Sequence, residues 1–221
     1  MLTNWTRLNP RNLLCAMLVT AVGAATLLAS GEAVASPHRA GHVYLLRGLF
    51  NVFSLGMDQI ASKLQAVGVT ATVHNHTVWR GLADDMIAQY RSGNREPIIL
   101  MGHSAGADAT IDIARRLQES SVPVALIVNF DPVSPAAVPP NVKQIVNYYV
   151  PAGWGAAVAA DKTFKGKLAN VNESGAVNHF SIDKDDALQR QTLAKVLSVV
   201  GSSGGRPTRR ANAAISAGPA Q

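Results

Sequence analysis

A chain of 221 residues is long enough for one domain, and with 48% apolar residues it can build a full hydrophobic core. Charged residues make up 15%, too few for an intrinsically disordered protein and too many for a membrane-embedded bundle. The net charge of +6 does not predict a nucleic-acid partner, because no basic stripe or aromatic platform accompanies it.

The first 35 residues have the pattern of a secretory signal peptide. Arg7 and Arg11 provide a positively charged start, and an almost unbroken apolar run follows from Leu13 to Leu28. The sequence Ala33-Val34-Ala35 is an A-x-A ending, so we expect cleavage after Ala35. A retained transmembrane anchor is the alternative, since the apolar run is near the lower limit for spanning a bilayer. We therefore expect an exported protein, secreted or periplasmic, without a stable membrane anchor.

Three parts are expected along the chain: a signal peptide over 1–35, one domain over 36–200 and a flexible tail over 201–221. The tail is rich in glycine, serine, alanine and proline, so it has little to bury. The only cysteine, Cys15, precedes the predicted cleavage point, so no disulfide is expected in the mature chain.

Short apolar runs alternate with segments of helical periodicity from His42 onward. The runs predicted to form strands are 42–46, 70–74, 97–101, 122–130 and 142–150. The segments predicted to form helices are 57–67, 81–90, 105–117 and 185–200. This alternation predicts an α/β fold in which helices cover both faces of a parallel sheet. The stretch 151–178 shows no clear periodicity, and we predict a loop there that flanks a functional site.

The pentapeptide Gly102-His103-Ser104-Ala105-Gly106 matches the pattern G-x-S-x-G. It directly follows the strongest candidate for a buried strand and directly opens a helix, which is the context that a nucleophile elbow requires. A sharp turn would project the Ser104 hydroxyl above the sheet edge, and the flanking glycines would leave room for it. The N–H of Ala105, at the start of the helix, would point toward a developing oxyanion. The pattern predicts Ser104 as a nucleophile.

A serine hydroxyl needs a base to remove its proton, and the chain has six histidines. His179 alone follows both the nucleophile and a plausible acid, in a loop before the last predicted helix. We predict that His179 is the general base, and a purely structural buried histidine is the alternative.

The acid that orients the base is expected at the end of a later strand. Asp131 meets this condition, because it follows the apolar run that ends at Phe130 and precedes Pro132. Asp161 and Asp183 are the rivals, although Asp183 is also suited to cap the closing helix. We predict Asp131.

The order Ser104, Asp131, His179 resembles the α/β-hydrolase superfamily over residues 42–200. The resemblance implies a minimal three-layer α/β/α fold with a small, mostly parallel sheet. An acid directly after the strand that follows the elbow helix resembles the thioesterase-like branch and some lipases. The usual His-Gly pair after the first strand is replaced by Arg47-Gly48-Leu49-Phe50. By analogy Leu49 supplies the second oxyanion-hole N–H beside that of Ala105, with Phe50 as the alternative under a shifted register.

The reaction that these residues imply is ester cleavage through an acyl-enzyme, without a metal or organic cofactor. We expect a monomeric carboxylesterase or small lipase whose partner is a small-molecule or lipid ester, with no nucleic acid. Phe50 and Trp154 are the predicted substrate-binding residues, and the aromatic residues near the loops indicate an apolar substrate group. A thioesterase, an acyltransferase with the same triad and a non-catalytic binding protein remain alternatives.

Overall fold

The computed structural model describes residues 38–49, 51 and 54–203. The predicted signal peptide, Phe50 and most of the predicted tail lie outside these residues. None of the helices that are described is both long and apolar enough to cross a membrane.

The described part of the chain forms one sheet of six parallel strands, in the order β2-β1-β3-β4-β5-β6. The strands are β1 (Arg39–Arg47), β2 (Val69–Asn75), β3 (Ile98–His103), β4 (Leu126–Phe130), β5 (Gln144–Tyr149) and β6 (Lys167–Asn172). The α-helices are α1 (Gly56–Ala66), α2 (Trp79–Arg91), α3 (Ala105–Glu119) and α4 (Asp186–Ser203). This arrangement confirms the predicted α/β fold with a small parallel sheet.

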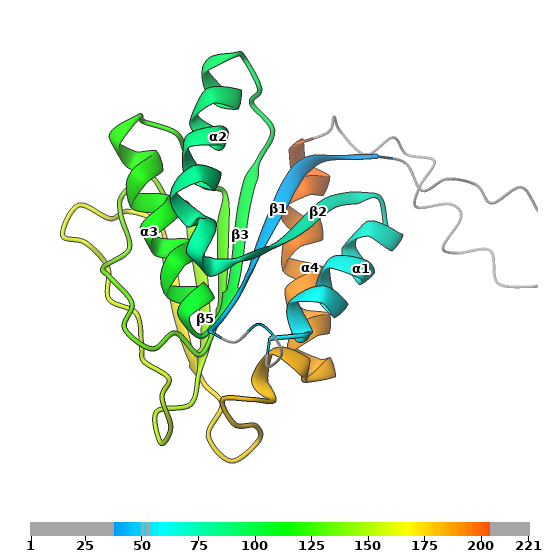
Figure 1. Cartoon of the computed structure of the whole chain (residues 1–221), viewed down its shortest axis with the longest axis vertical. Coiled ribbons are helices and arrows are strands. Elements are labelled where there is room, and N and C mark those ends of the chain that lie inside the picture. Colours follow the sequence, from blue (N-terminus) through cyan, green and yellow to red (C-terminus); the bar gives the residue numbers. More distant parts are fainter. Residues whose placement is uncertain (1–37, 50, 52–53, 204–221) are drawn as a thin grey trace, which may run out of the picture. The chain divides into compact units, whose positions relative to one another are not determined.

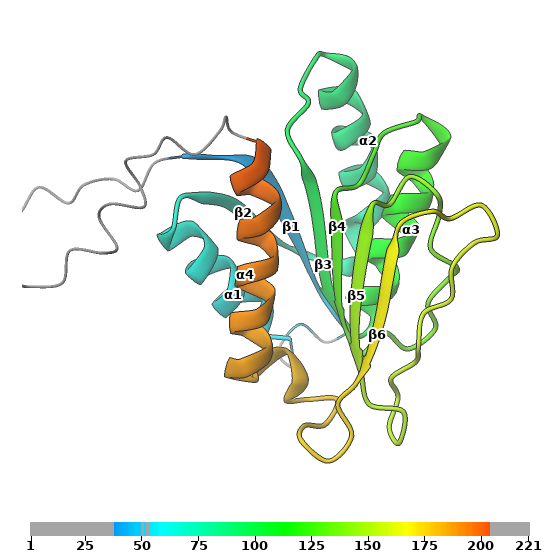
Figure 2. The same ribbon diagram turned by 180° about the vertical axis from the view of Figure 1, so that it is seen from behind.

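The helices form two layers, with α1 and α4 on one face of the sheet and α2 and α3 on the other (Figures 1 and 2). Because successive strand residues point to opposite faces, Val43 and Leu45 of β1 pack in the first core, whereas Tyr44 and Leu46 pack in the second. The central strand β3 reads Ile-Ile-Leu-Met and is buried on both faces, as expected of a parallel strand between two helical layers.

Strand β6 contradicts the prediction that 151–178 is entirely loop. Its sequence Lys-Leu-Ala-Asn-Val-Asn has few apolar residues, and most of its side chains are exposed because it is one of the two edge strands of the sheet. The strand is formed by main-chain pairing with β5, in register from Gln144–Lys167 to Tyr149–Asn172. An edge strand of which only Leu168 and Val171 are partly buried leaves no clear hydrophobic pattern in the sequence.

Several boundaries also differ from the predictions, among them those of β4 and α4. Strand β4 begins at Leu126 rather than Val122, and only an isolated bridge joins Val124 to Val142. Pro123 has no N–H to donate to a neighbouring strand, which favours the later start. Helix α4 ends at Ser203 and so extends three residues into the predicted tail.

Candidate active site

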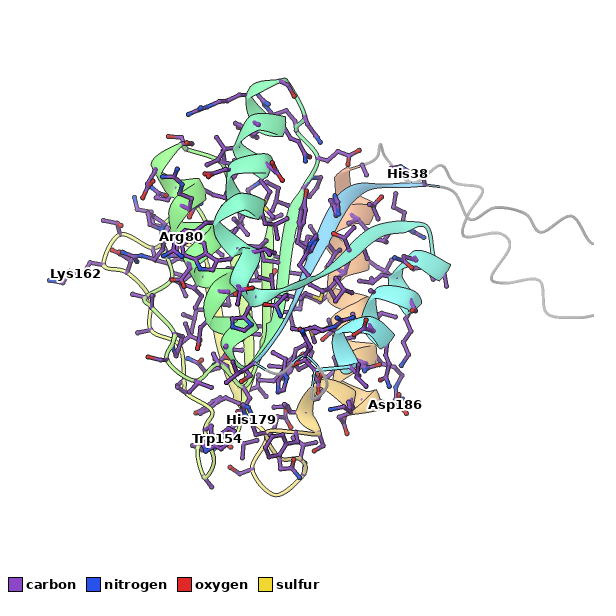
Figure 3. All side chains as sticks on the ribbon, viewed as in Figure 1. His38, Arg80, Trp154, Lys162, His179 and Asp186 are labelled. Atoms are coloured by element: carbon purple, nitrogen blue, oxygen red, sulfur yellow. The ribbon has the colours of Figure 1, made fainter. Side chains whose placement is uncertain are left out.

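The three predicted catalytic side chains come from segments that follow different strands of the sheet. Ser104 follows β3, Asp131 follows β4, and His179 lies in the segment between β6 and α4. Because the strands are parallel, their carboxyl ends meet at one edge of the sheet, which is where ligands usually bind in such folds. His179 and Trp154 lie close together at this end of the molecule (Figure 3).

The backbone at Ser104 makes the sharp turn that the pentapeptide predicts. Ser104 has φ +58° and ψ −129°, a conformation that a residue with a side chain adopts at a cost of about 1–3 kcal/mol. A Cβ on Gly102 would overlap the carbonyl of Gly106, and a Cβ on Gly106 would overlap that of Leu46. Both glycines are therefore required for the close approach of α3 to β1 and β3.

A continuous hydrogen-bond chain joins the three side chains. The Oγ of Ser104 lies 3.1 Å from Nε2 of His179, and Nδ1 of the same ring lies 2.6 Å from Oδ2 of Asp131. Asp131 only accepts, so Nδ1 carries the proton and donates, which leaves Nε2 free to accept from the Ser104 hydroxyl. The arrangement can remove the serine proton and stabilise the imidazolium that results.

The carboxylate of Asp131 is fully buried, and both of its oxygens accept a hydrogen bond. Oδ1 accepts the N–H of Val150 at 2.6 Å, while Oδ2 faces His179. Its backbone has φ +53° and is fixed by a bond from its own N–H to the carbonyl of Tyr148. Two donors fix the orientation of this carboxylate.

Neither rival acid reaches His179 by a hydrogen bond. Asp161 accepts the N–H of Thr163 within its own exposed turn. Asp183 is fully buried, and its Oδ2 accepts the N–H of Gly56 at the start of α1. Asp183 does not cap the closing helix either, since Asp185 accepts the N–H of Leu188 instead. The expectation that Asp183 is a helix cap was therefore wrong.

The loop after β1 passes directly over the nucleophile. A Cβ built on Gly48 would lie 2.8 Å from the Cβ of Ser104, so only a glycine fits there. The Gly48 N–H donates to the hydroxyl of Ser54 at 2.9 Å. Within the described residues, no hydrogen bond occupies the N–H groups of Leu49 and Ala105, the two predicted oxyanion donors. Phe50, the alternative donor and a predicted substrate-binding residue, lies outside these residues.

A pocket of about 420 Å³ opens beside Ser104, a size within the usual range of about 300–1,000 Å³ for small-molecule sites. Its large apolar lining residues are Leu49, Val133, Trp154 and Phe180. The predicted substrate-binding residue Trp154 is 61% exposed and packs edge-on against the ring of His179, with ring centroids 5.0 Å apart. Phe180 contacts the same imidazole from another side at 5.4 Å. The mouth of the pocket is therefore apolar and open.

Two groups that the sequence analysis did not assign to the site lie beside it. The carboxylate of Asp108, on the first turn of α3, accepts the N–H groups of Val133 and Ser134 and so fixes the loop after Asp131. Burial is the main cause that raises the pKa of Asp108, and the two N–H donors oppose it. His103 is buried under the elbow, and burial is also the main cause that lowers its pKa.

A second concave surface does not have this chemistry. A wider groove of about 580 Å³ at the opposite edge of the sheet is lined by Arg95, Glu96, Lys143 and Lys167 among other residues, and it contains no histidine. Among the residues that the structure describes, no group of three or more His, Cys, Asp or Glu side chains is placed to bind a metal ion.

Comparison with solved structures identifies the fold. An esterase domain from Rhodothermus marinus is similar to this chain with a TM-score of 0.50 and 14% identity, over 75% of this chain and 89% of that domain. Human thioesterase 2 gives a TM-score of 0.49 with 11% identity, over 76% of this chain and 100% of its own. An acetyl xylan esterase gives 0.44 with 15% identity, over 74% and 99%. No protein-family model and no curated protein matches the sequence. The likeness to the Rhodothermus domain, the parallel sheet and the turn at Ser104 together show the α/β-hydrolase fold.

Proposed function

We propose that this protein of α/β-hydrolase fold is a serine hydrolase that cleaves carboxylic esters through an acyl-enzyme. The observation that carries the proposal is the hydrogen-bond chain from Ser104 through His179 to the buried Asp131, beside an open apolar pocket. The Rhodothermus domain of the same fold is called an esterase. Since one fold supports many reactions, the proposal depends on the site and not on that name.

In the first step, the Oγ of Ser104 attacks the carbonyl carbon of the ester while Nε2 of His179 takes the hydroxyl proton. Asp131 accepts from the Nδ1–H and stabilises the imidazolium without taking its proton. The carbonyl oxygen becomes an anion, for which the N–H groups of Leu49 and Ala105 are the proposed donors. Ala105 is the first residue of α3, so the positive end of the helix dipole also faces the anion.

Collapse of this tetrahedral intermediate breaks the bond to the alcohol oxygen, which takes the proton from His179 and leaves. A water molecule then attacks the acyl-Ser104 ester while His179 again accepts a proton. The second intermediate releases the carboxylic acid and returns the proton to Oγ of Ser104. No metal or organic cofactor takes part in either step.

The surface around the pocket supports an apolar substrate group. In the described part of the chain, the large apolar side chains that are exposed are Leu49, Leu55, Val78, Val133, Trp154 and Phe180. Each of them lies in a segment that follows the carboxyl end of a strand, and Ser104 lies at the same end of the sheet. An apolar acyl or alcohol group would cover some of this area and gain hydrophobic free energy on binding. A carboxylesterase or small lipase is therefore proposed.

We also propose export, on the basis of the N-terminal sequence pattern alone. N-terminal sequencing of the mature protein from an expressing cell should begin at Ser36. A mature chain that retains Arg7 and Arg11 would show that the segment is an anchor rather than a cleaved signal.

The reaction is tested with a series of p-nitrophenyl esters of increasing acyl length. The wild-type protein should release nitrophenol with saturation kinetics, and Ser104→Ala should lower kcat by about 10⁶-fold. A thioester of the same acyl group and an added alcohol acceptor distinguish ester hydrolysis from thioester cleavage and acyl transfer. A Ser104→Ala protein that keeps a tenth of the activity would refute the proposal.

A further inference from the structure

A second buried cluster lies directly beneath the proposed site. It consists of Ser54, His103 and Asp183, whose side chains are at most 1% exposed. The residue types are those of a catalytic triad, but the geometry is not. Ser54 Oγ and Asp183 Oδ2 both approach the same ring nitrogen, Nδ1 of His103, at 2.8 and 4.0 Å. The other ring nitrogen, Nε2, lies 2.7 Å from the main-chain carbonyl of His179. The cluster therefore contacts the backbone of the proposed base.

The two ends of this hydrogen-bond chain fix the direction of its outer bonds. The His179 carbonyl can only accept, so Nε2 of His103 carries a proton and donates to it. The Gly48 N–H can only donate, so the oxygen of Ser54 accepts there. In a neutral His103 that carries its proton on Nε2, Nδ1 can only accept, so the Ser54 hydroxyl donates to it. The chain runs without interruption from Gly48 through Ser54 and His103 to His179.

The charges around His103 agree with the neutral form. Burial lowers the pKa of the ring, and the electrostatic interactions with Lys184 and His179 act in the same direction. The carboxylate of Asp183 and the carbonyl of His179 oppose this shift, but burial is the larger effect. A neutral ring is the state in which Nδ1 can accept from Ser54 and Nε2 can donate to His179.

This hydrogen-bond chain joins two loops that have different roles in the proposed reaction. At one end, it occupies the N–H of Gly48, the residue before Leu49, whose N–H is a proposed donor to the oxyanion. At the other end, it fixes the carbonyl of His179, whose ring must face both Ser104 and Asp131. The packing of the two histidine rings, 5.0 Å apart, adds a second contact.

We propose that His103 is a positioning residue, which aligns the His179 loop with the Gly48–Leu49 loop through the bonds from its Nε2 to the His179 carbonyl and from Ser54 to its Nδ1. This inference rests on the proposed function. The side chain touches neither the substrate nor the reacting atoms, and acts only through the two loops that it joins.

The test compares two amides at this position. The amide introduced by His103→Gln extends to about the position of ring Nε2 and can still donate to the His179 carbonyl, whereas the shorter amide of His103→Asn reaches only the position of Nδ1. His103→Asn should therefore lower kcat by about 10²-fold, as a small misplacement of a catalytic group does, with KM within about twofold of wild type. His103→Gln should recover most of this loss. Reaction with a fluorophosphonate should slow by the same factors, because it needs the same activated serine.

A second variant keeps the test informative if His103→Asn does not fold. Ser54→Ala removes the acceptor of the Gly48 N–H and the donor to Nδ1, and it should lower kcat about tenfold without raising KM. Thermal unfolding is measured for every variant. If folded His103→Asn and Ser54→Ala retain wild-type kcat and labelling rate and are only less stable, the cluster is purely structural and the inference is wrong.

The two proposals fail in different ways. If Ser104→Ala remains active, the proposed function fails whatever the His103 variants do. If Ser104→Ala is inactive while His103→Asn has wild-type kcat, only the positioning role of His103 fails.

Discussion

The backbone of Gly155 lies so close to the carboxylate of Asp131 that a Cβ built on Gly155 would overlap Oδ1. The same oxygen accepts the Val150 N–H at 2.6 Å, so it has little freedom to move aside. Gly155 thus packs directly against the carboxylate of Asp131, and the residue before it, Trp154, packs against the ring of His179. Gly153, two residues earlier, has no such close contact.

Gly155→Ala should lower kcat by at least about 10²-fold, because the new methyl group must displace the carboxylate that orients His179. The measurement is steady-state kinetics on a short p-nitrophenyl ester. Gly153→Ala is the matched control two residues away, since a Cβ there would meet only the Val150 carbonyl at an ordinary 3.7 Å. Equal kinetics of the two variants would contradict the role assigned to the contact between Gly155 and Asp131.

Asp131→Asn should lower kcat by about 10⁴-fold, since an amide at this position favours the wrong tautomer of His179. Asp161→Asn serves as the control, because the Asp161 carboxylate bonds only to Thr163 within its own turn. The variants should share the wild-type circular dichroism spectrum. If Asp161→Asn lost activity while Asp131→Asn stayed active, Asp161 would be the acid that orients His179.

Trp154→Ala should change the preference for acyl length. The exposed indole lines the pocket, so its loss removes apolar contact area that a long chain can cover and an acetyl group cannot. The ratio of kcat/KM for a long-chain ester to that for the acetyl ester should fall about tenfold. Val78→Ala removes an exposed apolar side chain that does not line the pocket, and it should leave the ratio unchanged. An unaltered ratio in Trp154→Ala would place the acyl group elsewhere.

Stability should fall as the pH is lowered from about 7.5 to about 5.5, on either side of the ordinary histidine pKa. Burial lowers the pKa of His42, His74 and His103 below the ordinary value of 6.5 in the folded protein. As the pH falls through 6.5, these histidines therefore bind protons in the unfolded chain while they are still neutral in the folded protein. Proton binding favours the unfolded state, so the free energy of unfolding is highest above pH 6.5 and decreases below it. Urea unfolding at the two pH values measures the difference. His103→Gln removes one of the three groups and should show a smaller decrease, whereas an identical decrease would mean that His103 does not contribute.

The helices and five of the six strands, including the edge strand β2, could be predicted because their burial leaves a pattern in the sequence. The stripe of Ala107, Ile111, Ala114 and Leu117 predicted α3, and each of these side chains is buried against the sheet. Strand β6 could not be predicted, because it is held by main-chain hydrogen bonds at the sheet edge and its side chains are largely exposed.

The close grouping of Ser104, Asp131 and His179 followed from parallel strands, whose carboxyl ends meet at one edge. The supporting contacts depend on tertiary distances that no local pattern carries. Asp183 resembled a helix cap because it precedes α4, yet it is buried against the first residue of α1. Ser54 and His103 are 49 residues apart in the chain, and nothing in either segment indicates their bond. The position of His103 inside the G-x-S-x-G pentapeptide was the only feature of the sequence that placed it near the site.

The most direct measurement of the central claim is peptide mass spectrometry after reaction with a fluorophosphonate. The wild-type protein should gain one adduct, on the peptide that contains Ser104, because Nε2 of His179 lies 3.1 Å from the hydroxyl and can take its proton. Ser104→Ala should gain none, and His179→Ala should react far more slowly although Ser104 is still present. An adduct on another residue, or equal labelling of the wild-type and Ser104→Ala proteins, would contradict the assignment of Ser104 as the nucleophile.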